Sequence, residues 1–282
     1  MAASSSSVSL LIYCSFCLLS FLALSSSLQT AASRRDGRSR ISSLISQQLF
    51  DSLFLHKDDP ACPANNFYTY ASFLEASTSF PKFGNTGSQL RRRREVAAFL
   101  AQVSHETTGG WPTAPDGPFA WGLCFKEEVS PPRVITATPP TNNGLATPAD
   151  LIKEEDLFSS RGILTLVTLV DSHLFYYPAG KALGFDGLRN PEIVSNNSLV
   201  AFKTALLVLD DRAKAQALLS QGHANRTVGY GMVTNIINGG LECGLPNDGQ
   251  VNDRIGYFQR YANLFGVDTG HNLDFQYQKP FN

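Results

Sequence analysis

A glutamate near the end of a predicted helix is the residue whose type and position most suggest chemistry. Phe99, Val103 and Glu106 are spaced at i, i+4 and i+7, so they lie on one face of that helix. The apolar members of this stripe predict that Glu106 points towards the interior. Burial disfavours the ionised form of a carboxyl group and raises its pKa, which suits a general acid. The alternative is a structural glutamate paired with a buried arginine.

A segment rich in glycine and proline follows this helix and contains both tryptophans of the chain, Trp111 and Trp121. Aromatic rings beside acidic groups suit a carbohydrate site, because sugar C–H faces pack on rings while hydroxyl groups need hydrogen-bond partners. Ordinary core packing is the alternative for both rings. Glu127 and Glu128 follow them and supply a second carboxylate. Two carboxylates from separate segments are the minimum equipment for hydrolysis of a glycosidic bond.

The helix that must position Glu106 has recognisable limits. Ser88 is a suitable N-cap, and the residues 107–110, Thr-Thr-Gly-Gly, end the periodic pattern. Apolar residues at helical spacing predict further helices over 41–56, 70–80, 199–219 and 253–265. Prolines predict a long loop over residues 130–160, and residues 163–170 form a β-like apolar run. The sequence therefore predicts a mainly α-helical protein.

Composition narrows the class of protein. The chain has 282 residues, of which 43% are hydrophobic and 17% charged, enough to bury one sizeable core in one or two domains. The formal net charge is -1, so no global positive charge favours nucleic acid or an anionic membrane as a partner. The run Arg91–Arg94 is better interpreted as the solvated start of a helix than as a nucleic-acid patch.

The N-terminus has the features of a targeting segment. Residues 10–24 are predominantly apolar, and small residues follow them. This order predicts a secretory signal peptide over residues 1–30 and a short connector over 31–40, with a membrane anchor as the alternative. Export would leave three cysteines in an oxidising compartment, Cys62, Cys124 and Cys243. One disulfide and one remaining thiol is the simplest arrangement, and no cysteine or histidine of the predicted mature chain lies at the spacing typical of a metal site.

Four segments resemble the plant family 19 chitinases closely. They are REVAAFLAQVSHETTGGWPTAPDGPFAWGLCFKEE (94–128), YYPAGKALGFDGL (176–188), TNIINGGLECG (234–244) and DRIGYFQRY (253–261). The resemblance extends to residues 67–83 and to the closing QKPF, so it covers most of residues 41–282. Only Cys62 precedes the HETTGG motif in that range, so the chain is similar to class II-like endochitinases, which lack a hevein-type chitin-binding module.

The resemblance implies a lysozyme-like, two-lobed helical domain over 41–282 with a long substrate cleft. Chitin or N-acetylglucosamine oligomers are the implied substrates, and no cofactor or metal is implied. Glu106 would be the general acid and Glu128 the general base of an inverting hydrolysis. We expect a monomer that is secreted to the apoplast, with the vacuole as an alternative, and that has no nucleic-acid or membrane partner.

The resemblance also assigns supporting residues. Glu242 and Arg254 match the charged pair beside the family's acid, while Lys203 and Asn238 match positions that contact sugar. Trp111 and Trp121 fall on the substrate side. Cys62 and Cys124 match a family disulfide that ties the N-terminal segment to the segment carrying the base.

The chain departs from the family over residues 129–175. Counted back from Pro178 without a gap, Asp171 and Phe175 stand where the family has a serine and an asparagine that hold the nucleophilic water and the sugar. The family's partner for Cys243 also has no matching cysteine. Three hypotheses therefore remain: an endochitinase, a catalytically impaired chitinase-like protein that binds glycans, and a defective gene product that folds poorly.

Overall fold

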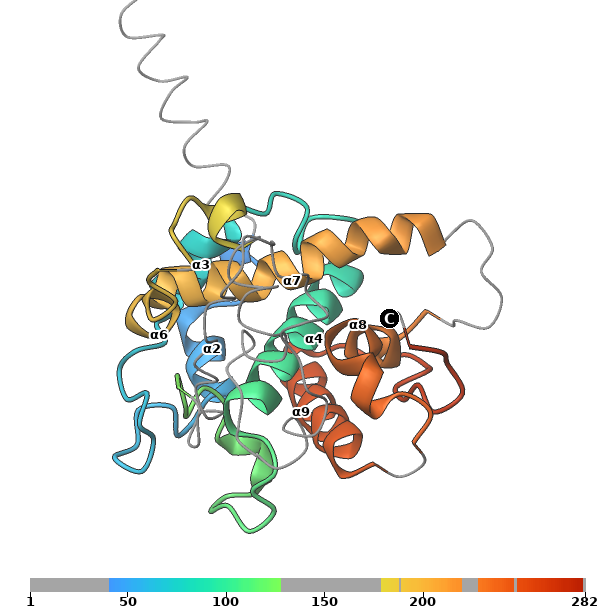
Figure 1. Ribbon diagram of the computed structural model, residues 1–282. Coiled ribbons are helices and arrows are strands. Elements are labelled where there is room, and N and C mark those ends of the chain that lie inside the picture. Colours follow the sequence, from blue (N-terminus) through green and yellow to red (C-terminus); the bar gives the residue numbers. More distant parts are fainter. Residues whose placement is uncertain (1–40, 128–178, 188, 220–227, 246–247, 281–282) are drawn as a thin grey trace, which may run out of the picture.

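The computed structural model describes residues 41–127, 179–187, 189–219, 228–245 and 248–280, which are helical and contain no strand (Figure 1). The helices of the N-terminal half are α2 (Gln47–Leu53), α3 (Tyr70–Ser77), α4 (Gln89–Thr108) and the 3₁₀ turn η1 (Pro118–Ala120). Those of the C-terminal half are α6 (Ile193–Asn196), α7 (Ser198–Leu219), α8 (Tyr230–Glu242) and α9 (Gly249–Phe265). The predicted mainly α class is confirmed. The proline-rich loop and the β-like run lie outside the described residues.

Helix α4 begins and ends where the sequence predicts. The Ser88 hydroxyl accepts a hydrogen bond from the Arg91 N–H at 3.3 Å, which satisfies one of the unpaired donors of the first turn. At the other end the Gly109 N–H donates to the His105 carbonyl, and the helix stops. Every residue from Val96 to Thr108 is buried, including the polar ones. The last turns of α4 are therefore covered on all sides.

Three other helices differ from their predictions. The predicted helix 41–56 is interrupted, because Ser46 acts as the N-cap of α2 and its hydroxyl accepts from the Leu49 N–H. Helix α3 ends at Ser77 rather than at residue 80. Helix α9 starts four residues before its predicted first residue, since the Asp248 carboxylate caps the N–H groups of Gln250 and Val251. Helix α8 was not predicted.

The core is built around α4. Helix α9 packs along it, α8 contacts both α4 and α9, and α3 packs on α7; α4 crosses the middle of the view between these groups (Figure 1). Aromatic rings fill the space between α2, α3, α4 and α7: Phe73 lies 5.9 Å from Phe50, 6.1 Å from Phe99 and 5.6 Å from Phe202, measured between ring centroids. This packing fixes α4, and with it the position of Glu106.

Within the described part of the chain, no helix is both long enough and apolar enough to span a bilayer.

Candidate active site

Glu106 lies in the last turns of α4, and its side chain is only 4% exposed. Its Oε1 atom accepts a hydrogen bond from Nη1 of Arg254, which comes from α9. The predicted inward orientation of Glu106 is thus confirmed. The ion pair with a buried arginine, expected for a purely structural glutamate, is also present.

Arg254 joins a second carboxylate to the first. Its Nε donates to Oε2 of Glu242 at 3.0 Å and its Nη2 donates to Oε1 at 2.7 Å, a two-point contact from α9 to the end of α8. Both side chains are almost fully buried. Burial acts to lower the pKa of Arg254, but the charges of Glu106 and Glu242 outweigh it and raise that pKa above its ordinary value.

The trio contains two carboxyl groups and one guanidinium group. A permanently charged guanidinium compensates one of two ionised carboxylates, so the fully ionised trio carries a net charge of −1 inside the protein. Glu242 has the two-point contact with Arg254 and is held as a carboxylate partner. Glu106 contacts Arg254 through Nη1 alone, so Arg254 holds Glu242 by two contacts and Glu106 by one.

A break in α8 brings Asn238 to the same network. Asn238 has non-helical backbone angles, φ −139° and ψ 32°, inside the helix. Its Nδ2 donates to Oε1 of Glu242 at 2.5 Å. Gly239 follows, and a Cβ atom there would lie 2.0 Å from the buried Oδ1 of Asn235. The glycine therefore makes space for this local geometry, which places Asn238 beside the charged trio.

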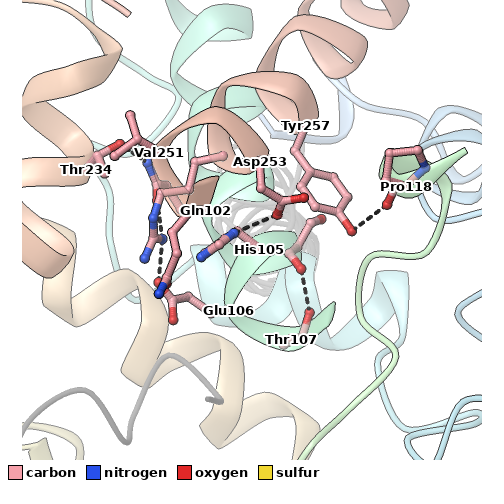
Figure 2. A network of polar contacts seen from close by, with 12 residues as sticks. Gln102, His105, Glu106, Thr107, Pro118, Thr234, Val251, Asp253 and Tyr257 are labelled. Atoms are coloured by element: carbon pink, nitrogen blue, oxygen red, sulfur yellow. Dashed lines mark hydrogen bonds and ion pairs between the residues drawn. The ribbon is translucent and has the colours of Figure 1, made fainter. Parts of the chain in front are cut away.

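His105 forms a second link between α4 and α9. Its Nδ1 lies 2.7 Å from Oδ2 of Asp253, and both side chains are mostly shielded from solvent (Figure 2). Gly109 packs against this pair, since a Cβ atom there would come within 2.6 Å of both partner atoms. Consecutive residues of α4 thus contact consecutive residues of α9, which aligns the two helices beside the candidate acid.

The segment that leads to Glu128 is tied to the end of α4. The Leu123 N–H donates to the Thr107 hydroxyl at 2.9 Å, and the Cys124 N–H donates to the Thr108 hydroxyl at 3.1 Å. The predicted disulfide between Cys62 and Cys124 is present. Glu128 itself lies outside the described residues, as do Asp171 and Phe175. The structure therefore describes the approach to the candidate base up to residue 127.

The two tryptophans have different surroundings. Trp121 is 3% exposed, stacks on His56 with 4.2 Å between ring centroids, and donates from Nε1 to the Pro115 carbonyl at 2.7 Å. Core packing describes this ring. Trp111 is 38% exposed and rests against Trp121, with 4.9 Å between centroids. Of the two, Trp111 is the ring that can present a face to a ligand.

Comparison with known proteins decides the family. The glycoside hydrolase family 19 model, described as chitinase class I, matches residues 44–275. The chain belongs to this family. It is therefore a glycoside hydrolase, and its fold is the mainly α, lysozyme-like fold of that family.

Named relatives agree with this assignment. Chitinase 10 of Oryza sativa subsp. japonica is 50% identical over 256 residues, which cover 86% of this chain and 84% of the relative. Basic endochitinase B of Arabidopsis thaliana is 43% identical over 256 residues, with coverage of 86% and 72%. Among solved structures, the class IV chitinase from Zea mays aligns with a TM-score of 0.56 at 28% identity, over 82% of this chain and 98% of that one.

Lys203 and Cys243, both noted from the resemblance, make no described contact with Arg254. Lys203 of the family 19 enzyme is half-buried on α7, and none of the contacts among the described residues joins it to the Arg254 network. Cys243 directly follows Glu242, and its Sγ lies 2.8 Å from the Gln278 carbonyl oxygen. The thiol thus contacts the C-terminal segment where that segment passes the end of α8.

Sequence reasoning missed Gln102 and Thr234, which extend the polar network behind the acid. Both are completely buried, at 0% and 1% exposure. A signal was available, because Gln102 lies four residues before Glu106 and so on the same face of α4. It was overlooked because a lone glutamine in a helix usually faces solvent.

Among the residues that the structure describes, no group of three or more histidine, cysteine, aspartate or glutamate side chains could hold a metal ion.

Proposed function

We propose that this family 19 enzyme is a secreted endochitinase, which hydrolyses the β-1,4 linkages between N-acetylglucosamine units of chitin by an inverting acid/base mechanism. The observation that carries the proposal is the buried contact between Glu106 and Arg254 at the end of α4. A carboxyl group that is shielded from water and faces one side of a shared guanidinium suits a general acid. The names of the relatives, chitinases and endochitinases, support the substrate class.

In the proposed reaction Glu106 donates its proton to the glycosidic oxygen as the bond to the sugar breaks. Glu106 then becomes a carboxylate, and Arg254 Nη1 is already in place to stabilise the new negative charge. Glu242 holds Arg254 through its two-point contact, so little reorganisation accompanies proton transfer. Glu128 acts as the base that activates water on the opposite face of the sugar, about 6.5 to 9.5 Å away from the acid. No cofactor takes part.

Substrate contacts are assigned to three described residues. Trp111 offers a partly exposed ring on which a sugar face can pack. Asn238, beside Glu242, offers an amide, and Lys203 offers an ammonium group from α7. The ligands are chitin oligomers, and the enzyme acts as a monomer. It is exported to the apoplast, or alternatively the vacuole, after removal of residues 1–30.

The second candidate function is binding of chitin-like glycans without catalysis. The observation that favours it is the altered sequence over 129–175, with Asp171 and Phe175 at the positions where the family has its water-holding serine and asparagine. Loss of groups that position the water can reduce the rate by orders of magnitude while weak binding persists.

Hydrolysis of a soluble chitin hexamer separates the two functions. The purified chain is compared with Glu106→Gln, which keeps the size of the side chain and its hydrogen bond to Arg254 but has no proton to donate. Turnover should yield the α-anomer by NMR, and Glu106→Gln should reduce kcat by about 10²- to 10⁴-fold. A folded wild-type chain that binds the hexamer and never cleaves it would leave the binding function. A β-anomer product would exclude the inverting mechanism.

A further inference from the structure

We propose that Gln102 is a positioning residue, which divides the hydrogen-bonding capacity of Arg254 between itself and the acid and so sets the pH range over which Glu106 keeps its proton. The inference rests on the proposed role of Glu106. It goes beyond that role because the Gln102 side chain acts on Glu106 through Arg254 and has no substrate contact in the proposed reaction.

Gln102 and Glu106 compete for the same nitrogen atom. Nη1 of Arg254 donates to Oε1 of Gln102 at 2.8 Å and also to Oε1 of Glu106. The two acceptors come from residues one helical turn apart on α4. An Nη1 atom carries two N–H bonds, so each acceptor holds one of them. Gln102 thereby prevents Arg254 from turning both N–H bonds to the acid.

The orientation of the Gln102 amide follows from its partners. A guanidinium only donates, so the atom that faces Arg254 must be the carbonyl oxygen. The amide nitrogen then faces α8, where Nε2 donates to Oγ1 of Thr234 at 2.8 Å. Thr234 and Gln102 are both buried, so neither contact competes with water. Three helices are thus connected behind the acid, α8 through Thr234, α4 through Gln102 and α9 through Arg254.

An apolar side chain could fill the same space, so packing alone does not require a glutamine at this position. A buried amide without partners is unfavourable, whereas here both ends of the amide are used. Removing the oxygen acceptor frees one N–H of Arg254, and the ionised form of Glu106 is the acceptor beside it. The ion pair would tighten and the acid would lose its proton at a lower pH.

Several ionisable groups lie around Arg254. Glu106 and His105 belong to α4, Tyr230 and Glu242 to α8, and Asp253 to α9 itself. The described contacts place His105 and Asp253 against each other. Burial, as the largest cause, raises the pKa of Tyr230 well above its ordinary value, so this phenol stays neutral over the working pH range.

Two substitutions at position 102 should shift the pH profile in opposite directions. Gln102→Met removes the acceptor at similar volume, and the alkaline limb of kcat should move to lower pH by about half a unit to one unit. Gln102→Glu adds a negative charge that opposes ionisation of the acid, and the limb should move to higher pH by about one unit. KM should change less than twofold, because Gln102 does not face the substrate.

Thr234 supplies a test of the same chain of contacts that leaves Gln102 in place. Thr234→Val removes the hydroxyl acceptor and leaves the amide of Gln102 unsupported, so the limb should shift in the direction of Gln102→Met. Thr234→Ser keeps the hydroxyl and should restore the wild-type profile. Ser104→Ala is the matched control. Ser104 also lies on α4, and the substitution removes its buried 2.7 Å hydrogen bond to Tyr261 of α9, which involves neither Gln102 nor Arg254, so the limb should stay unchanged.

Titration of the Glu106 carboxyl by ¹³C NMR gives a readout that needs no turnover, with Glu106→Gln used to identify the resonance. Midpoints that move down in Gln102→Met and up in Gln102→Glu would support the inference even in a chain that does not cleave chitin. Midpoints that stay unchanged in both folded variants, or that move in the same direction, would overturn it and leave the proposed function intact. In that case Gln102 would only stabilise the fold.

Discussion

The acid side of the site and the segment that leads to the base are held in place by different kinds of contact. Glu106 depends on side-chain charges, since Arg254 from α9 and Glu242 from α8 surround it. The segment 121–127 depends on backbone hydrogen bonds to Thr107 and Thr108 and on the disulfide of Cys124. Both sets of contacts meet the last turn of α4 from different directions.

This difference separates two physical requirements. A group that must change its protonation state needs neighbours whose charges respond to that change, so the acid side is built from an arginine and a second carboxylate. A segment that must only hold a position needs contacts that are insensitive to pH, and backbone hydrogen bonds and a disulfide meet this need. Changes to the two sides should therefore have different signatures.

Removing Arg254 should have the largest effect on stability. Arg254→Ala leaves the carboxylates of Glu106 and Glu242 buried without their shared cation, which should lower the free energy of unfolding by about 3–5 kcal/mol at neutral pH. The loss should shrink in acid, where both carboxyl groups can be protonated. Urea unfolding at several pH values measures this.

The double variant Glu242→Gln/Arg254→Leu is the control for this prediction, because it removes one negative charge together with the cation. It should be more stable than Arg254→Ala at neutral pH. If the two variants were equally unstable at every pH, packing rather than charge would explain the role of Arg254.

Removing the disulfide should cost less, and the cost should not depend on pH. The bond joins residues 62 positions apart in sequence, so Cys62→Ala/Cys124→Ala should lower the free energy of unfolding by about 2–4 kcal/mol. Thermal unfolding with and without reductant measures this, since reductant should destabilise the wild type and leave the variant unchanged. A strong pH dependence of the loss would contradict the distinction between the two sides.

Glu95 offers the smallest and sharpest test, because it is a carboxylate of the same helix that lacks a buried arginine contact among the described residues. Burial raises its pKa to about 7, while a hydrogen bond from the Gly84 N–H and the charge of Arg91 act in the opposite direction. A raised pKa in the folded state means that the protein loses stability as the pH rises from about 4.5 to about 7.

Glu95→Gln should remove that loss. The variant should match the wild type below pH 4.5 and exceed its stability by about 1 kcal/mol above pH 7, after allowance for the partial exposure of the side chain. Guanidinium unfolding across this window is the measurement. If the difference in free energy of unfolding between the wild type and Glu95→Gln were the same below pH 4.5 and above pH 7, ionisation of Glu95 would carry no cost in the folded protein.

Much of the fold around α4 follows from local sequence signals. The Ser88 cap, the apolar residues at helical spacing and the two glycines at 109–110 predict the limits of this helix, and the structure agrees. The starts of α2 and α9 were harder to predict from the sequence, because Ser46 and Asp248 cap these helices only where tertiary packing lets the chain turn. Helix α8 was missed since glycines and asparagines have low helix propensity, and packing against α4 and α9 overrides it.

The tryptophans show a similar division. Their types and positions suggest a carbohydrate surface, and composition alone cannot rank them. The fold buries Trp121 between His56 and Trp111 and leaves part of Trp111 accessible. Burial depends on neighbours that are distant in sequence, so it could not be read from the segment that contains both rings.

Motifs and periodicity along one helix are enough to predict the family, the mainly helical class and the inward direction of Glu106. The groups that lie around that glutamate depend on how distant helices pack. Arg254, Glu242, Gln102 and Thr234 come from three helices that are separated by up to about 150 residues along the chain. Their meeting in one buried space follows from how α8 and α9 pack on α4, and this packing lets one arginine contact Glu106, Glu242 and a buried amide together.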